Sequence, residues 1–531
     1  MTKREGRVLL THQLFPKSYI KESSDNVVVS DHMWLTDEKN FNKTTLFHRF
    51  ISSLAYAKRH RYHRCWVGDG PKAGPFTRAC RFLKSKGIKD IRIFDPIDVP
   101  LRRSIQNICS RESMNVVFDD TPAFMETHED LDRFLKESPP KKMKSLRKYS
   151  HNPFYKWQRK RLGILVSKDG SPMGGRLTYD TENRKPFPKG LDKDPTTIVT
   201  PLPLPEGVSK GDLKTIRDFI YKKYKTNPGT IPEEGLGSAG LYPMTNRQAM
   251  DRLQGFLKSM LPKFGPYEDA IHPNITYGYH SVLSSSLNNG LITPEQILNT
   301  MRKGVLKKQG ELKGELLASV EGFIRQVFGW RSYTRLVYRE ERETMLRSNH
   351  MRHSRRLPRS WFRDSPITTK IPWLDTLFNE SYHKAYSHHI IRLMVFSQWF
   401  LLMRIHPRDV LDWFWSVVSI DAYEWVMVPN VLGMGQYADG GIMMTRPYVS
   451  SSSYLETMSR KTLKGSVIIG KDLVQWQDIW KSLYYDFLIH HEKRLGKQYA
   501  YSSTYARIRK TSAEQIKEWK DLSKRYRKSV L

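Results

Sequence analysis

The sequence predicts a doubly wound α/β domain at the N-terminus and a large all-α domain at the C-terminus. Apolar strand-like segments alternate with amphipathic helical segments through the first 120 residues. A stretch rich in Pro, Gly and Lys follows, and from about Met244 the spacing of apolar residues is that of helices. We therefore expect an α/β domain over residues 1–130, an interdomain connector over 131–243 and an all-α domain over 244–531.

The α/β domain is predicted from a regular alternation of the two periodicities. Strands are expected at residues 7–15, 64–68, 89–96 and 114–120, and helices at residues 45–60, 76–87 and 101–113. Strand and helix in regular turn favour a parallel sheet with helices on both faces.

The composition favours a folded protein that binds a polyanion. The 531 residues include 88 Lys and Arg against 54 Asp and Glu, a formal net charge of +34, and 39% of them are hydrophobic. Such a charge attracts nucleic acid. The alternative is a solvated basic surface that binds nothing in particular.

Cysteine usage and hydropathy bear on the cellular compartment. Cys65, Cys80 and Cys109 share no CxxC spacing, so a disulfide framework is not expected and a reducing cytosol fits. No signal peptide is recognisable, and no run of 18 apolar residues lacks a charge. We expect a cytoplasmic, monomeric protein that does not enter a membrane.

The stretch "AYSHHIIRLMVFSQWFLLMRI", residues 385–405, reads as a buried helix that carries a cation. Its apolar residues recur at spacings near 3.6, while His388, His389 and Arg392 interrupt them. A buried unpaired cation costs on the order of several kcal/mol. Asp421, in a segment dense in Trp and Tyr, is the candidate counter-ion.

Two further segments carry polar groups suited to a pocket. Residues 276–298 combine Ser residues with an Asn-Asn-Gly turn before a helix start, which suits a phosphate. In residues 320–340, Gln326, Trp330 and Arg331 lie within about one helical turn. Taken singly, the first is more often an ordinary helix–loop–helix with Ser caps, and the second is more often core packing with Arg at its rim.

In their order along the chain, these segments resemble the photolyase and cryptochrome superfamily. The motifs are "HSVLSSSLNNG", "EGFIRQVFGWR", "HHIIRLM", "IDAYEWVMVPNVLGMGQYADGG" and "TRPYVSSSSY". Together with "GILVSKDGSPMGGRLTYDTENRKPFP" and "PYEDAI", they are most similar to the prokaryotic (6-4) photolyases of the iron–sulfur group. The resemblance covers nearly the whole chain.

The resemblance implies an FAD enzyme that uses light to repair (6-4) pyrimidine–pyrimidone lesions in UV-damaged DNA, and so a protein associated with the nucleoid. His389 would be the proton donor, with a pKa near the working pH, and His388 would orient it or touch the lesion. Arg392 and Asp421 would pair beside the flavin, and Met427 would face its N5 atom. The other implied roles are FAD contacts for His280, Ser281, Leu283, Ser284 and Gln326, electron relay for Trp413 and Trp415, and lesion contacts for Met434, Tyr448 and Tyr454.

The chain departs from that group in four places. Residues 459–480, where relatives hold cluster cysteines, contain none, so we expect no iron–sulfur cluster and no other metal, with packing around Trp476 and Trp480 in its place. Met427 replaces a polar side chain, and Phe414 replaces a relay Tyr of some relatives. The region expected to contact a ribityl-lumazine antenna, residues 30–47, matches poorly, which leaves that chromophore open.

Three other functions remain as alternatives. A cyclobutane pyrimidine dimer photolyase does not require a His at position 389. A cryptochrome-type blue-light photoreceptor usually has a variable tail, whereas this chain ends in a short basic helical segment. A nucleic-acid-binding protein without photochemistry would show no flavin absorbance.

Overall fold

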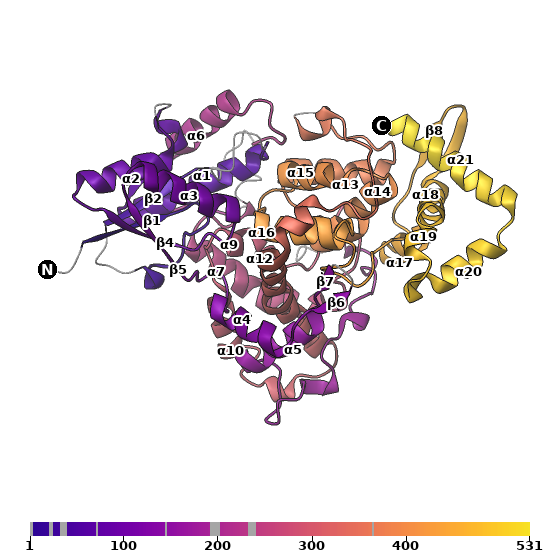
Figure 1. The fold of residues 1–531 in the computed structure, drawn as a ribbon, viewed down its shortest axis with the longest axis horizontal. Coiled ribbons are helices and arrows are strands. Elements are labelled where there is room, and N and C mark those ends of the chain that lie inside the picture. The colour runs from indigo at the N-terminus through magenta and orange to yellow at the C-terminus, as the bar shows by residue number, and fades with distance from the viewer. Residues whose placement is uncertain are drawn as a thin grey trace.

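The computed structural model describes residues 4–20, 25–31, 40–70, 73–143, 146–191, 202–231, 241–363 and 366–531. A sheet with its helices forms one end of the molecule, and helices make up the middle and the other end (Figure 1). The expected fold class, α/β followed by a large helical region, is confirmed.

The sheet has five parallel strands in the order β3-β2-β1-β4-β5. Its elements are β1 (Glu5–Leu9), β2 (Asp25–Ser30), α1 (Lys43–His60), β3 (His63–Trp66), α2 (Pro75–Ser85), β4 (Asp90–Phe94), α3 (Val99–Arg111) and β5 (Asn115–Asp119). The strand order reverses between β1 and β4, so right-handed connections put α2 and α3 on one face and α1 on the other.

Two details of the sheet differ from the sequence prediction. Strand β2 was missed, although Val27, Val28 and Val29 are all buried in it. Strand β1 ends at Leu9, so residues 10–15 of the strand predicted over 7–15 lie in the loop that follows β1. All three cysteines are buried in this domain, and none of them forms a disulfide bond.

The segment expected as a surface connector has more regular structure than its composition suggested. It contains α4 (His128–Glu137), the hairpin β6 (Lys141–Met143) and β7 (Leu146–Lys148), α5 (His151–Leu162) and α6 (Lys210–Lys223). Helix α5 buries Phe154 and Tyr155, and Tyr155 donates a hydrogen bond of 2.9 Å to buried Glu321. This part of the chain is therefore packed into the molecule.

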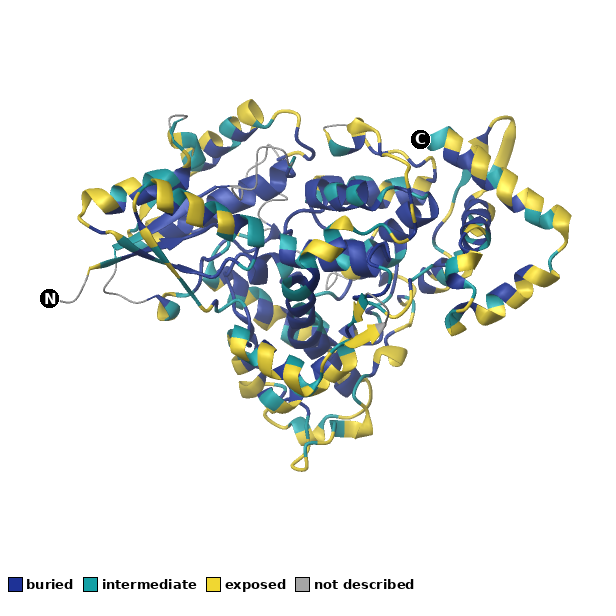
Figure 2. Ribbon diagram, in the orientation of Figure 1, coloured by how far each residue is buried: buried dark blue, intermediate teal, exposed yellow. Residues whose placement is uncertain are grey.

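The described part of the remainder is helical and includes four π-helical stretches, η8 (Phe256–Met260), η10 (Arg325–Trp330), η12 (Ile391–Phe396) and η13 (Val428–Gly435). The α-helices are α7 (Asn246–Gly255), α8 (Leu261–Phe264), α9 (Ser284–Asn288), α10 (Pro294–Lys303), α11 (Gly314–Ile324), α12 (Arg331–Arg347), α13 (Pro372–Lys384), α14 (Ser397–Leu402), α15 (Pro407–Val417), α16 (Glu424–Met427), α17 (Ser452–Met458), α18 (Trp476–His490), α19 (Glu492–Leu495), α20 (Ser502–Lys510) and α21 (Ala513–Val530). Dark, buried segments dominate the middle of the molecule (Figure 2).

One hairpin interrupts the helical region, where no strand was predicted. Strands β8 (Ser466–Ile469) and β9 (Asp472–Gln475) pair antiparallel around Gly470, within the stretch where relatives were expected to hold cluster cysteines. Trp476 and Trp480 follow at 0% exposure, and their indole N–H groups donate to backbone carbonyls of Leu463 and Ser450. Trp373 packs against both rings, at centroid distances of 5.2 and 6.0 Å.

The sheet end and the helical middle are joined by buried polar contacts. From α1, Arg49 donates to the carbonyl of Ala422 at 2.9 Å. Asp98, which precedes α3, accepts from the backbone N–H groups of Glu424 and Trp425 at 2.9 and 2.8 Å. Strands β1 and β4 flank the reversal in strand order, and doubly wound folds often bind a ligand at that point. Asp98 follows β4, so helix α16 meets the α/β domain there.

Within the described ranges, every helix is either too short or too polar to span a lipid bilayer.

Candidate functional site

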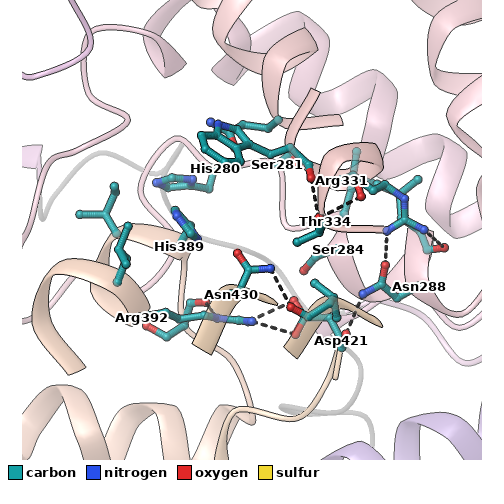
Figure 3. Close-up of a pocket in the computed structure, with 18 of the residues that line it drawn as sticks. His280, Ser281, Ser284, Asn288, Arg331, Thr334, His389, Arg392, Asp421 and Asn430 are labelled. Carbon is teal, nitrogen blue, oxygen red and sulfur yellow. Dashed lines mark hydrogen bonds and ion pairs between the residues drawn. The ribbon is translucent and has the colours of Figure 1, made fainter. Parts of the chain in front are cut away.

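A cavity of about 280 Å³ lies inside the helical region, near the lower end of the range of roughly 300–1,000 Å³ typical of ligand pockets. Its wall is mostly apolar, and a few polar side chains converge on it (Figure 3). Ten of the fifteen residues to which the resemblance assigns a site role line it: His280, Ser281, Leu283, Ser284, Gln326, His389, Arg392, Asp421, Met427 and Met434. They come from segments spread over more than 150 positions of the chain.

Arg392 and Asp421 form a two-pronged ion pair in this wall. Their N–O distances are 2.9 and 3.1 Å, and Arg392 Nε also donates to the carbonyl of Ser387 at 2.6 Å. The Arg392 side chain is 18% exposed and that of Asp421 is 7% exposed. The Arg392 guanidinium in this apolar helix thus has a carboxylate partner, which removes most of the free-energy cost of burying the positive charge.

Three of the four π-helical stretches contribute to the cavity wall. Gln326 and Trp330 come from η10, Arg392 from η12, and Asn430 and Met434 from η13. The sequence predicted an ordinary helix over 385–405, but its first turn begins only at His389 and continues as η12 and then α14. Wider π turns are common at functional sites, because the extra residue redirects side chains.

A second guanidinium in the wall has no carboxylate partner. Arg331 lies over the rings of Phe124 and Trp425 at 4.7 Å each and donates to Asn288. Among the described residues, no Asp or Glu lies within ion-pair distance of it, and burial lowers the pKa of Arg331 to about 9. Its partner Asn288 also donates to the backbone carbonyl of Asp421 at 2.6 Å, so Asn288 links the Arg331 guanidinium to the backbone at Asp421.

Two histidines, His280 and His389, lie in another part of the wall, and a third, His388, stacks on the first. The rings of His280 and His388 stack at 4.4 Å and 20°, and His389 lies beside His280 at the cavity (Figure 3). Burial first and then the Arg392 guanidinium lower the pKa of His389 to about 4. The resemblance implied a pKa near the working pH; desolvation of the ring, and after it the nearby Arg392 guanidinium, account for the lower value.

Five predicted site residues lie outside the wall. His388 stands behind His280, and its Nδ1 has no partner among the described residues. Tyr448 and Tyr454 lie near Asp180, Arg184 and Asp269. The last two, Trp413 and Trp415, are buried in α15.

The two α15 tryptophans face different neighbours. Trp413 packs edge-on against Phe414, which lines the cavity, at 5.0 Å, and against Phe378 and Phe400 at 5.1 Å each. Trp415 instead contacts Phe41, close to the α/β domain, at 6.0 Å. From Phe378 and Phe400 the aromatic series continues to Trp399, whose ring stacks on Trp361 at 5.3 Å.

Sequence reasoning missed several members of the wall. Asn288 and Asn430 lay inside segments that were recognised, yet nothing in one sequence distinguishes them from ordinary turn or helix polar residues. The sequence suggested only that Arg331 lies at the rim of the core. Its position directly after Trp330 was the available signal that it belongs to the pocket wall. Glu268 is the acidic residue within the quoted "PYEDAI" motif, was given no role there, and lines the cavity beside Gln326.

Two further expectations concern an antenna chromophore and a metal site. Residues 32–39 of the region considered for an antenna lie outside the described residues, so the structure does not test that chromophore. Within the described ranges, no group of three or more His, Cys, Asp or Glu side chains is arranged to hold a metal ion.

The sequence of this chain is similar to those of several known proteins. The family described as "Deoxyribodipyrimidine photo-lyase-related protein" matches residues 7–233. A "(6-4) photolyase" of Agrobacterium fabrum is 28% identical over 452 residues, which are 84% of this chain and 82% of that protein. An uncharacterized protein of Acanthamoeba polyphaga mimivirus is 37% identical over 118 residues, 22% of this chain and 88% of its own length.

Among solved structures, a bacterial class III photolyase from Agrobacterium tumefaciens superposes with a TM-score of 0.55 at 14% identity, covering 87% of this chain and 85% of that chain. This likeness shows the fold. The fold, the matched segments and the relative that spans most of the chain agree with one another and support the photolyase/cryptochrome superfamily for this chain.

Proposed function

We propose that this protein binds FAD in the cavity and uses light to repair (6-4) photoproducts in DNA. The observation that carries the proposal is the joint presence of His389 and the Arg392–Asp421 pair in one cavity wall. An imidazole and a neutralised ion pair at a shared, mostly apolar cavity are suited to a planar cofactor and a proton transfer beside it.

The residues of the wall fit an anionic dinucleotide cofactor. Arg331 offers a buried positive charge that no described carboxylate neutralises, and a diphosphate would supply the missing negative charge. Ser281 and Ser284 offer hydroxyl groups on the same loop. When bound and reduced, FAD would supply the light-excited electron for the reaction; Met427 offers it only a thioether, which accepts hydrogen bonds poorly.

The damaged base has to leave the double helix to reach this cavity. That step costs a few kcal/mol, and less for a damaged pair than for a normal one. Met434 and Trp330 offer apolar and aromatic surface to an extruded base. The net charge of +34 supplies the attraction for the phosphates on either side.

His389 would hold and donate the proton of the repair reaction. In the protein alone its pKa of about 4 leaves the ring neutral at neutral pH. DNA phosphates near the cavity would oppose the effect of Arg392 and raise that pKa, so substrate binding itself would charge the donor. His388, behind His280, would then act on the orientation of the wall rather than on the lesion.

The test is a repair assay of purified, flavin-loaded protein on oligonucleotides that carry either a (6-4) lesion or a cyclobutane dimer, in light and in darkness. Light-dependent repair of the (6-4) lesion is expected. Light-dependent repair of the cyclobutane dimer alone would favour the dimer photolyase. Flavin absorbance without repair of either lesion would favour a cryptochrome-type photoreceptor, and absence of flavin absorbance would contradict all three.

A further inference from the structure

Glu268 occupies the cavity wall in the turn after α8 and is 7% exposed. Three hydrogen-bond donors point at its carboxylate: Asn183 Nδ2 at 2.7 Å, Arg325 Nη2 at 3.4 Å, and Gln326 Nε2 in a short contact. Burial raises the pKa of Glu268, as do the carboxylates of Asp180 and Glu321 to a smaller extent, while Arg325 and Asn183 oppose that rise. A carboxylate surrounded only by donors has the environment of the ionised form.

The contact with Gln326 has a consequence for the polarity of the wall. An ionised carboxylate only accepts hydrogen bonds, so Gln326 has to turn its Nε2 group toward Glu268. The carbonyl oxygen, Oε1, is thereby directed away from Glu268, and it makes no hydrogen bond to a described residue. Gln326 lines the cavity, so that free oxygen is an acceptor offered to whatever binds there.

The same residue also approaches a neighbour through its backbone. The backbone of Glu268 lies close enough to the ring of His280 to raise the pKa of that imidazole, against a stronger lowering by burial, and Nε2 of the ring has no partner among the described residues. His280 and Gln326 both line the cavity. Two polar side chains of the wall therefore lie against one position in the chain.

We propose that Glu268 is a positioning residue that locks the Gln326 carboxamide with its oxygen toward the cavity, so that this wall selects a ligand that donates an N–H group. The proposal rests on the proposed function. The chemistry it names is the imide N–H of a pyrimidine ring, present both in the isoalloxazine of a flavin and in thymine-derived bases of damaged DNA. A site built to accept a hydrogen bond discriminates against a ligand that cannot donate one.

The experiment uses full-length Glu268→Gln, which keeps the shape and the backbone contact to His280 but can donate as well as accept. Gln326 is then free to flip. Two affinities are measured: that of the apoprotein for FAD, by flavin fluorescence, and that of the holoprotein for an oligonucleotide carrying a (6-4) lesion. Loss of one well-oriented hydrogen bond is expected to weaken one of them by about five- to tenfold.

Which affinity falls identifies the donor: a loss for FAD assigns it to the flavin, and a loss for DNA assigns it to the lesion. Glu315→Gln is the matched control, because Glu315 is exposed and pairs only with Lys185. Gln326→Met removes the carboxamide while Glu268 keeps Asn183 and Arg325, and it is expected to give the same loss. The double variant is expected to match Gln326→Met alone, because Glu268 acts through Gln326.

Unchanged affinities in Glu268→Gln, or additive losses in the double variant, would overturn the role of Glu268. Thermal unfolding of each variant reports whether it folds, and Gln326→Met tests the proposal even where Glu268→Gln does not fold. A wild-type protein that takes up no FAD would contradict the proposed function as well, whereas wild-type uptake with an unaffected Glu268→Gln variant contradicts this proposal alone.

Discussion

At the scale of single residues, His389 combines access to the cavity with a depressed pKa. With a pKa of about 4 the ring is neutral in the free protein, so in the proposed repair reaction it would have to take up its transferable proton when the substrate's phosphates raise that pKa. Its chemistry therefore depends on Arg392, three positions along the same helix, as much as on the ring itself.

Replacement of His389 by Asn keeps a polar side chain but removes the transferable proton. We expect repair of the (6-4) lesion to fall by about 10²- to 10⁴-fold, the usual contribution of a general acid, with FAD binding retained. Repair yield per absorbed light dose is the measurement. His383→Asn, at an exposed position of α13, is the control, and undiminished repair by His389→Asn would remove the proposed proton donor.

The Arg392–Asp421 pair gives a second prediction at this scale. Asp421→Asn leaves a largely buried guanidinium without its counter-ion, which is expected to lower the free energy of unfolding by about 3–5 kcal/mol. Denaturant titration measures it. Asp472→Asn breaks the exposed pair with Arg525 at 2.7 Å and is expected to change stability by no more than about 1 kcal/mol. Equal effects of the two substitutions would contradict the role of burial.

Individual residues differ in how far the sequence alone predicts them. The need for a partner of Arg392 followed from the cost of burying a charge, and Asp421 was the acidic residue chosen from a segment dense in Trp and Tyr. The depressed pKa of His389 did not follow, because it depends on the distance between two side chains. Nor did the bridge from Asn288 to Arg331 and Asp421, which joins residues up to 133 positions apart.

At the scale of elements, the helices were easier to predict than their exact turns. Apolar spacing near 3.6 identified the buried helix around Arg392, but no periodicity separates an α turn from the π turn of η12, which tertiary packing stabilises. Strand β2 and hairpin β8–β9 were missed although each carries consecutive β-branched residues, Val27–Val29 and Val467–Ile469. Short strands beside stronger helical signals are the elements most easily overlooked.

Helix α15 leads to a prediction about electron supply. Its Trp413 contacts cavity-lining Phe414 and leads through Phe378 or Phe400 to Trp399 and Trp361, whereas Trp415 contacts Phe41. We expect Trp413→Phe to slow the photoreduction of bound, oxidised flavin markedly and Trp415→Phe to leave it nearly unchanged. Flavin absorbance during illumination with an external reductant is the measurement. The opposite ranking would place the relay on the side of Trp415.

At the scale of the whole molecule, buried neutral histidines set an acid limit to stability. His48, His353, His388 and His491 are at most 4% exposed, and burial lowers the pKa of each, to about 4 for His48 and about 3 for His491. In the unfolded chain these rings titrate near 6.5. Between about pH 4 and 6.5 the unfolded state therefore binds more protons, so stability rises with pH across that window.

The thermal midpoint is expected to fall steadily as pH is lowered from 6.5 toward 4.5, and to be nearly flat from 7 to 8 as far as these groups are concerned. His48→Gln keeps a donor for the carbonyl of Pro243 but cannot titrate, and it is expected to make the decline shallower. Midpoints independent of pH in this window would contradict the neutral state of the four rings.

The overall plan was accessible from sequence because each half has its own periodicity, and the basic charge is a sum over residues that needs no structure. The fit between the halves was not accessible. It depends on Asp98, an unremarkable residue before α3, reaching the first backbone N–H groups of α16.

That contact bears on how such a protein can be recombined. Glu424, whose N–H meets Asp98, is itself paired with Arg342 at 2.7 Å, and α16 carries Trp425 and Met427 into the cavity. A chimera that borrows its first 120 residues from a homologue without an acid at this position would leave the end of α16 untethered. Grafted front halves should therefore succeed only when the carboxylate travels with them.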